Sequence, residues 1–500
     1  MKTILFAVFL ACSSLLYGQE RFHEWQNQVV VLPGDYADPS VLKDGDNYYM
    51  THSPFFYQPG FLIWHSRDLV NWTPVCRAGS SWEGSAWAPD LQKVGDTYYI
   101  YFPANNTNYV ITAKDIRGPW SEPIDLKIEG IDPGLAVTPD GKRYLFTNGG
   151  NVTPLTDDGL ARDGGTKHVY DGWEYPQEWE TECMCLESPK MTYREGYYYM
   201  VSAQGGPAGP STSHMVACAR SKSIYGPWED SPYNPIVHTY SADERWWSKG
   251  HGTIVEGPRG QWYVVYHAYD KNAYSLGRQT LMEPIEWTEN GWFRPVKDMV
   301  TPQPVFAANS VKDISDDFAG PTLGWQWTAW KENVNMVAKQ SNGTLSIPAK
   351  GTSPADGRLL LVTATDNSYA VEATLSADDK NVSSGILLFY NEKAFAGVLC
   401  SKKNITVYKS ATVTEEYPNT CGKISHLRLE NSDGQLSVFT SRDGSKWTPL
   451  VTGIDITGLH HNNLGDFIAL RPALCSIGKG KAKFLDFRYM PLCDEKKALR

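Results

Sequence analysis

Three acidic residues occupy matching positions in a repeated pattern of the sequence. Proline follows Asp38 and Asp132 directly, and it follows Glu187 after one residue. An Asp-Pro pair on its own is a common start of a turn, but three acids at equivalent places favour a shared site. A confined group of carboxyls suits cleavage of a glycosidic bond, which needs one protonated acid and one ionised carboxylate.

Like charges in a confined site raise the pKa of one of the groups, so that one carboxyl stays protonated near neutral pH. A third carboxylate can then tune and orient that acid. Two further copies of the pattern carry Trp87 and His251 at the position of the acids. The five positions together predict a pocket with acidic, aromatic and imidazole side chains.

Five predicted β-hairpins must position these residues. Each copy has an apolar strand, a turn rich in Asp or Gly, and an aromatic strand. Strand repeats of roughly 50 residues indicate a propeller, here a five-bladed β-propeller, whose inner strands converge on a central channel. Chance hairpins in a generic β-rich protein are the alternative, which five copies disfavour. The copies are 41–51, 91–102, 136–147, 190–202 and 254–267.

Six short motifs follow one another between about residues 30 and 300. They are ADPS with Asp38, SAWAPD with Trp87, IDPG with Asp132, ESPK with Glu187, GHGT with His251 and LGRQTLMEPIEW with Arg278. In this order and spacing the sequence resembles glycoside hydrolase family 43, the β-xylosidase and α-L-arabinofuranosidase family.

The resemblance implies a role for each matched residue. Asp38 is the general base that activates water, and Glu187 is the general acid that protonates the leaving sugar. Asp132 raises the pKa of Glu187 and holds it in place. Arg278 contacts substrate hydroxyls, and Trp87 forms a wall of the pocket. The family inverts the anomeric configuration in a single displacement, for which the base and acid must leave room for a water molecule.

His251 is expected to face the channel, beside the substrate, a bound Ca²⁺ or a water cluster; a core histidine is the alternative. We expect no required cofactor, with a structural Ca²⁺ at His251 as the metal alternative, although hard cations prefer oxygen ligands. In the long segment 151–186, Glu180 and Glu182 compete as the acid. Neither has the proline that marks the start of a blade, which favours Glu187.

The chain is predicted to be all-β, with the propeller over 28–305 and a β-sandwich over 314–492. Alternating strands separated by turns predict two packed sheets, and the domain resembles the concanavalin-like jelly roll that follows β-xylosidase propellers. Residues 1–18 are typical of a signal peptide, so the protein is expected to be exported, periplasmic or extracellular. Lipidation at Cys12 is the alternative.

Composition limits the partners. The net charge of −10 disfavours nucleic acid and anionic membranes, and no segment beyond the signal peptide is long and apolar enough to be transmembrane. The oligomeric state stays open. Export permits disulfides, for which the candidates are Cys183, Cys185, Cys400, Cys421, Cys475 and Cys493.

The predicted function is release of terminal β-D-xylosyl or α-L-arabinofuranosyl units from plant cell-wall polysaccharides or oligosaccharides. One alternative is an arabinanase or galactan-active hydrolase of the same family. The other is a propeller that binds carbohydrate without catalysis, against which the three intact acids argue.

Overall fold

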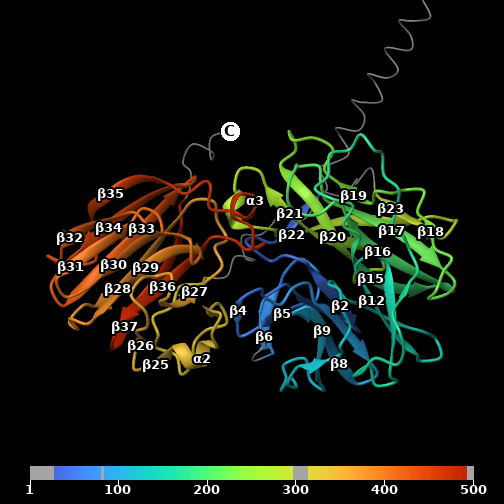
Figure 1. The fold of residues 1–500 in the computed structure, drawn as a ribbon, viewed down its shortest axis with the longest axis horizontal. Coiled ribbons are helices and arrows are strands. Elements are labelled where there is room, and N and C mark those ends of the chain that lie inside the picture. The colour runs from blue at the N-terminus through green and yellow to red at the C-terminus, as the bar shows by residue number, and fades with distance from the viewer. Residues whose placement is uncertain (1–27, 80–83, 297–312, 493–500) are drawn as a thin grey trace, which may run out of the picture.

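Two all-β domains lie side by side in the computed structural model, which describes residues 28–79, 84–296 and 313–492 (Figure 1). The predicted signal peptide and Cys12 lie outside these residues. Within them, no helix has the length and apolar character needed to cross a membrane. The prediction of an all-β chain is confirmed.

The N-terminal domain is a five-bladed β-propeller, as predicted. Each predicted hairpin forms the two inner strands of one antiparallel blade. Blades one to four consist of β2 (Ser40–Asp44), β3 (Asn47–Thr51), β5 (Phe61–Ser66) and β6 (Thr73–Ala78); β7 (Asp90–Val94), β8 (Thr97–Ala104), β9 (Thr107–Ala113) and β10 (Ile124–Asp125); β11 (Gly134–Val137), β12 (Arg143–Thr147), β13 (Asn151–Leu155) and β14 (Lys167–His168); and β15 (Glu187–Arg194), β16 (Tyr197–Gln204), β17 (Met215–Ser221), β18 (Glu229–Asp230) and β19 (Val237–His238).

Blade five closes the propeller with a strand from its N-terminal end. The strand β1 (Val29–Leu32) pairs antiparallel with β22 (Gln279–Trp287) and so joins the two ends of the domain. Closure removes the free edges that an open array of blades would expose. The sequence pattern did not predict this strand. The other strands of the blade are β20 (Trp246–Glu256), β21 (Trp262–Asp270) and β23 (Phe293–Pro295).

Aromatic side chains of the second inner strands stabilise the packing between blades. Tyr48 of blade one is 1 % exposed, and Tyr98 of blade two packs edge-on against Tyr49 with ring centroids 6.2 Å apart. Large rings suit this place because each buries a wide apolar surface on a pleated sheet. The aromatic repeat read from the sequence is therefore the packing that holds the blades around the channel.

The C-terminal domain is a sandwich of two antiparallel sheets, as predicted. Within the described residues there are three short helices. The helix η1 (Tyr274–Leu276) lies in the propeller, and α2 (Val334–Val337) and α3 (His461–Leu464) lie in the sandwich. One sheet contains β4 (Tyr57–Gln58), β24 (Thr328–Trp330), β27 (Arg358–Leu361), β29 (Val382–Asn391), β30 (Ala394–Cys400), β31 (Asn404–Tyr408), β32 (Thr414–Pro418) and β36 (Arg471–Gly478); the other contains β25 (Lys339–Ser341), β26 (Thr344–Pro348), β28 (Tyr369–Ser376), β33 (Ile424–Ser432), β34 (Gln435–Ser441), β35 (Thr448–Asp455) and β37 (Lys481–Pro491).

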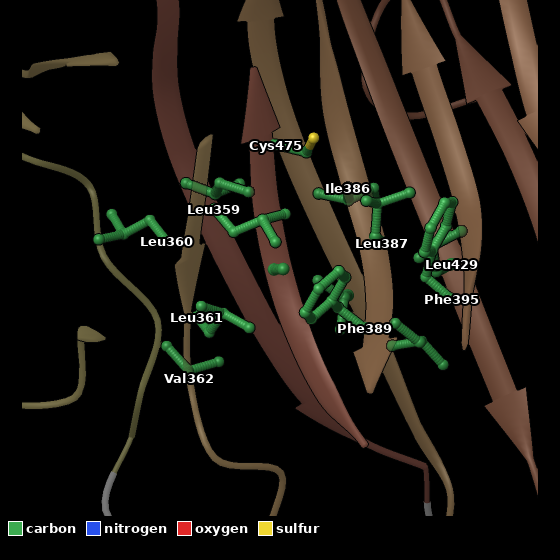
Figure 2. Packing of buried hydrophobic residues seen from close by; sticks show 14 of the residues in the cluster. Leu359, Leu360, Leu361, Val362, Ile386, Leu387, Phe389, Phe395, Leu429 and Cys475 are labelled. Atoms are coloured by element: carbon green, nitrogen blue, oxygen red, sulfur yellow. The ribbon is translucent and has the colours of Figure 1, made fainter. Parts of the chain in front are cut away.

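The sandwich core is apolar and continuous. Leu361, Leu387, Phe389 and Leu429 are buried in one cluster drawn from both sheets (Figure 2). Burial alternates along β33, as expected for a strand with one face on the core and one in solvent. Burial of this apolar surface is the main force that holds the two sheets together.

The two domains share a sheet. The strand β4, which belongs to the propeller part of the chain, pairs with β24 of the sandwich, so that Tyr57 lies opposite Trp330. Near the channel, the Tyr269 hydroxyl contacts His461 Nδ1, and the Leu470 N–H donates to the Ser275 carbonyl at 3.1 Å. The domains are therefore in firm contact, although residue 305, the predicted end of the propeller, lies outside the described residues.

Two of the six cysteines proposed as disulfide candidates are bonded in the structure: Cys183 and Cys185 form a disulfide. Cys400, Cys421 and Cys475 are free thiols, and Cys493 lies outside the described residues.

Candidate active site

The six predicted site residues line one pocket at the end of the propeller channel. The empty space at the pocket, with the open solvent at its mouth included, is about 440 Å³. Its lining consists of Asp38, Phe55, Trp87, Ile131, Asp132, Glu187, Pro207, His214, His251, His267, Arg278 and Phe467.

The backbone at the start of the inner strands explains how these side chains converge. Asp38, Asp132, Ser188 and His251 all adopt left-handed backbone conformations, with φ between 53° and 58°. This region is uncommon for residues other than glycine and is enriched at functional sites. Ser188, followed by proline, is the counterpart of the two aspartates. Glu187 therefore precedes the turn by one residue.

Asp38 is a buried carboxylate with several donors. The Arg278 Nη1–H donates to Asp38 Oδ1 at 2.9 Å, and the Ser53 hydroxyl donates to Oδ2 at 2.5 Å. The Asp38 N–H donates to Nδ1 of His267 at 3.1 Å. The His251 Nδ1 lies 3.4 Å from Asp38 Oδ1. These contacts leave the carboxylate fixed beside the pocket.

The charge state of Asp38 follows from these neighbours. Burial alone would raise the pKa of its carboxyl, but the Arg278 guanidinium holds the pKa well below its usual range. Burial also lowers the pKa of His267 to about 4 and depresses the pKa of His251. Both imidazoles are thus uncharged near neutral pH, and Arg278 is the cation that keeps Asp38 ionised.

The pKa values of the Asp132 and Glu187 carboxyls are raised, in contrast to that of Asp38. Burial and the Asp38 carboxylate raise the pKa of Asp132, which accepts a hydrogen bond from the Ser188 N–H. Burial raises the pKa of Glu187 well above its usual value, and the carboxylates of Asp132, Asp38 and Glu182 add to that effect. Neighbouring carboxyls of this kind titrate as a pair. The upward shifts of Asp132 and Glu187 therefore belong to the pair, which retains a proton to higher pH than isolated carboxyls do.

His251 faces the channel, as expected. Its Nδ1 lies 3.7 Å from Asp132 Oδ2 as well as beside Asp38, and its ring packs against His267 with centroids 5.7 Å apart. A third imidazole, His214, also lines the pocket. Gly250 permits its approach, because a Cβ at position 250 would lie 1.6 Å from His214 Cδ2.

The donor set around His251 does not favour the calcium alternative. Calcium prefers six to eight oxygen ligands, whereas the neighbours of His251 are only two carboxylates, Asp38 and Asp132, beside other imidazoles and the cations Arg278 and Lys190. In the described residues, no group of three or more His, Cys, Asp and Glu side chains has an arrangement suited to a metal ion. A metal at His251 stays a prediction.

Trp87 and Phe467 lie across the pocket mouth from different domains. The Trp87 ring is 36 % exposed, and its centroid lies 6.4 Å from that of Phe467. The Phe467 carbonyl also accepts a hydrogen bond from Arg278 Nη2 at 3.3 Å. The sandwich therefore contributes directly to the pocket.

The residues competing for the role of the acid lie elsewhere. Glu182 and Glu180 are exposed and do not line the pocket. The Glu182 Oε2 accepts the Ala208 N–H at 2.7 Å, so this carboxylate holds the loop that carries Pro207. Glu187 alone of the three reaches the pocket.

Sequence reasoning missed His214, His267, Phe55 and Phe467. His267 is the last residue of the fifth predicted hairpin, 254–267, so its position in the repeat was a usable signal. Phe467 follows the helix α3 in the sandwich and has no sequence signal that connects it to the propeller.

Comparisons with known proteins agree with this arrangement. The family described as Glycosyl hydrolases family 43 matches residues 27–293, and the Beta xylosidase C-terminal Concanavalin A-like domain matches residues 315–490. A solved structure of a xylan beta-1,4-xylosidase from Bacillus halodurans C-125 superposes with a TM-score of 0.80 and 25 % identity, covering 93 % of this chain and 100 % of that one.

Two relatives illustrate the similarity in sequence. A xylan 1,3-beta-xylosidase of a Vibrio species is 29 % identical over 59 % of this chain and 63 % of its own length. A non-reducing end alpha-L-arabinofuranosidase of Bacteroides ovatus is 28 % identical over 65 % of this chain and 64 % of its own length. The chain thus spans less than two thirds of the length of each of these relatives.

Proposed function

Because the chain belongs to glycosyl hydrolases family 43, we propose that it is an inverting exo-glycoside hydrolase. It removes terminal β-D-xylosyl or α-L-arabinofuranosyl units from plant cell-wall polysaccharides or oligosaccharides. The observation that carries the proposal is that the pKa values of two carboxyls in one pocket are shifted in opposite directions. Asp38 is held ionised and Glu187 is held protonated.

The proposed reaction uses these two charge states directly. Asp38 accepts a proton from a water molecule as the water oxygen attacks the anomeric carbon. Glu187 donates its proton to the leaving oxygen as the glycosidic bond breaks. Each group acts in the form that its surroundings favour near neutral pH, which is the arrangement that glycoside hydrolysis needs.

Asp132 has a supporting role in this scheme. An ionised Asp132 favours the protonated form of Glu187, because two adjacent negative charges repel each other. The Ser188 N–H, next to Glu187 in the chain, bonds to Asp132 and fixes the relative position of the two side chains. We therefore assign Asp132 to tuning and orientation of the acid.

Three further residues are assigned to the substrate. Trp87 offers a partly exposed ring that can pack against a sugar face. The Arg278 Nε–H and the His251 Nε2 are buried and have no hydrogen-bond partner within the described residues. Such polar atoms favour a ligand with hydroxyl groups, since a buried polar group without a partner is costly.

The position of Phe467 supports removal of a terminal unit. Its ring comes from the sandwich and narrows the pocket opposite Trp87. A pocket closed on one side accepts the end of a chain more readily than its middle. The relatives are named for xylosidase and for arabinofuranosidase activity, so both sugars are kept in the proposal.

The test is a panel of aryl β-xyloside, α-arabinofuranoside and galactoside substrates, followed by polysaccharide digests. We expect turnover on the first two substrates, and NMR of the first sugar released should show the inverted configuration. Asp38→Asn should abolish turnover while the fold, followed by circular dichroism, stays intact. Retained configuration, or full activity of Asp38→Asn, would refute the mechanism.

A further inference from the structure

A buried ion pair lies on the propeller axis, behind the acidic residues. Lys190 and Asp90 are 4 % and 1 % exposed, and Lys190 Nζ lies 3.3 Å from Asp90 Oδ1. Neither residue lines the active-site pocket, but both line a second cavity along the inner strands. We propose that this pair is a positioning device for the proposed reaction, which fixes Asp132 and Glu187 relative to each other and places a positive charge near Asp132.

Lys190 joins three blades through one ammonium group. Its Nζ donates to the Pro89 carbonyl at 2.7 Å and to the Pro133 carbonyl at 3.3 Å. Pro133 follows Asp132 directly in blade three, and Lys190 itself lies three residues after Glu187 in blade four. The ammonium group therefore bridges the backbone segments that carry the tuning acid and the general acid.

Asp90 completes the bridge from the other side. Its Oδ2 accepts the Leu135 N–H of blade three at 2.8 Å. The Ser40 hydroxyl of blade one lies 3.5 Å from Asp90 Oδ1 and in turn accepts the Leu91 N–H at 2.9 Å. Ser40 is two residues after Asp38. The pair thus connects the starts of blades one to four.

Close backbone packing leaves little freedom at this point. A Cβ at Gly134 would lie 1.7 Å from the Pro189 carbonyl oxygen, so blades three and four touch directly beside Lys190. A small displacement of the ammonium group is expected to shift both acids. Catalytic groups need placement within a fraction of an ångström to react efficiently.

The charge of Lys190 acts on Asp132 as well. Lys190 lowers the pKa of Asp132, against burial and the Asp38 carboxylate, which raise it. Without the ammonium group, Asp132 would take up a proton at higher pH and stop repelling a second negative charge on Glu187. The charged and titratable groups that face Asp132 are Asp38, Glu187, Lys190, His251 and Arg278.

A purely structural role is the alternative, and it makes different predictions. A buried ion pair adds little net stability compared with apolar packing, because both charges lose their hydration. A structural pair would affect unfolding when either partner is removed, and it would leave the pH dependence of catalysis unchanged. If the pair has the proposed role, removal of the lysine charge and removal of the aspartate charge should shift the pH profile of catalysis in opposite directions.

The experiment measures kcat/KM against pH for variants of both partners on an aryl xyloside or arabinofuranoside. The fall of kcat/KM at low pH, the acidic limb of the profile, reports a carboxyl that must be ionised for activity. Of the carboxyls that must be ionised in this scheme, Asp132 has the highest pKa and therefore sets the limb. Lys190→Met should move the limb upward by about one pH unit, since the loss of a nearby opposite charge has an effect of that order. Asp90→Asn should move it downward. Lys190→Arg, which keeps the charge, should return the limb towards the wild-type position.

Controls separate positioning from folding. The double variant with Lys190→Met and Asp90→Asn leaves no unpaired buried charge, so it should fold even if Lys190→Met alone does not, and its limb should still lie above that of Asp90→Asn. Lys249→Met is the matched control, because Lys249 is fully buried and pairs with Glu244 at 2.7 Å in blade five. It should lower the unfolding temperature without moving the limb.

The outcomes distinguish this inference from the proposed function on which it rests. An inactive wild-type enzyme on every substrate of the panel would overturn the proposed function. An active wild-type enzyme whose limb stays in place in Lys190→Met, Asp90→Asn and the double variant would overturn the positioning role alone.

Discussion

Removal of Arg278 should change how activity depends on pH, as well as its absolute level. In Arg278→Met, the cation that contacts Asp38 Oδ1 at 2.9 Å is lost. With charges about 4 Å apart and an effective dielectric constant of about 20, the lost attraction is about 4 kcal/mol. This attraction favours the ionised form of Asp38, so its loss should raise the pKa of the Asp38 carboxyl.

The direction of the effect follows from the burial of Asp38. Burial already favours the protonated form, and Arg278 is the main group that opposes it. Arg278 also lowers the pKa of Asp132, so both carboxyls should become harder to ionise. We expect the acidic limb of kcat/KM to move upward by about 1 to 2 pH units, because the loss of a nearby opposite charge raises the pKa of a carboxyl by that order.

The assay is a pH series on an aryl glycoside substrate, with Arg278→Lys as the matched control. Lysine keeps the positive charge but lacks the planar guanidinium, so its limb should stay near that of the wild type even if KM rises. A uniform loss of kcat/KM across the pH range in Arg278→Met, with an unmoved limb, would refute the electrostatic argument and leave only a role in substrate binding.

Three further predictions concern the acid and the pocket mouth. Asp132→Asn should move the basic limb of kcat/KM to lower pH, because the pKa of Glu187 falls when the neighbouring negative charge is removed; an unmoved limb would exclude the tuning role. Glu187→Gln should slow substrates with poor leaving groups far more than activated aryl glycosides, and equal losses on both would argue against Glu187 as the acid. Phe467→Ala should raise KM more than it lowers kcat, because the ring lines the pocket and is not one of the acids. Equal unfolding temperatures of the variant and the wild type are the control, and an unchanged KM would show that the ring does not contact the sugar.

Local signals in the sequence predicted the parts of the fold that local physics determines. Each hairpin carries its own turn and its own aromatic strand, so five blades could be recognised one at a time. The strands β1 and β4 could not be recognised in this way. Val29–Leu32 pairs with a strand about 250 residues later in the chain, and Tyr57–Gln58 leaves the propeller to join a sheet of the sandwich. Such pairings depend on where distant segments meet.

The same limit applies to the site. Asp38 and Asp132 could be identified because the repeat marks the start of each inner strand. The electrostatic role of Lys190 could not, because it arises from contacts with carbonyl groups of two other blades. Phe467 lies in the other domain, and only the packing of the two domains brings it to the pocket.

The ionisation of the proposed base depends on both domains. Asp35, in the propeller, accepts the Arg278 N–H at 3.4 Å through Oδ1 and pairs through Oδ2 with Arg471 of the sandwich, also at 3.4 Å. The Phe467 carbonyl holds the other end of Arg278. Two sandwich residues thus help to hold Arg278, whose guanidinium keeps Asp38 charged: Phe467 contacts the guanidinium, and Arg471 acts through Asp35 on the backbone N–H. The sandwich is therefore part of the electrostatic environment of the pocket. Substitutions at its contact with Asp35 should alter the ionisation of Asp38, because a buried charge responds strongly to the loss of a nearby partner.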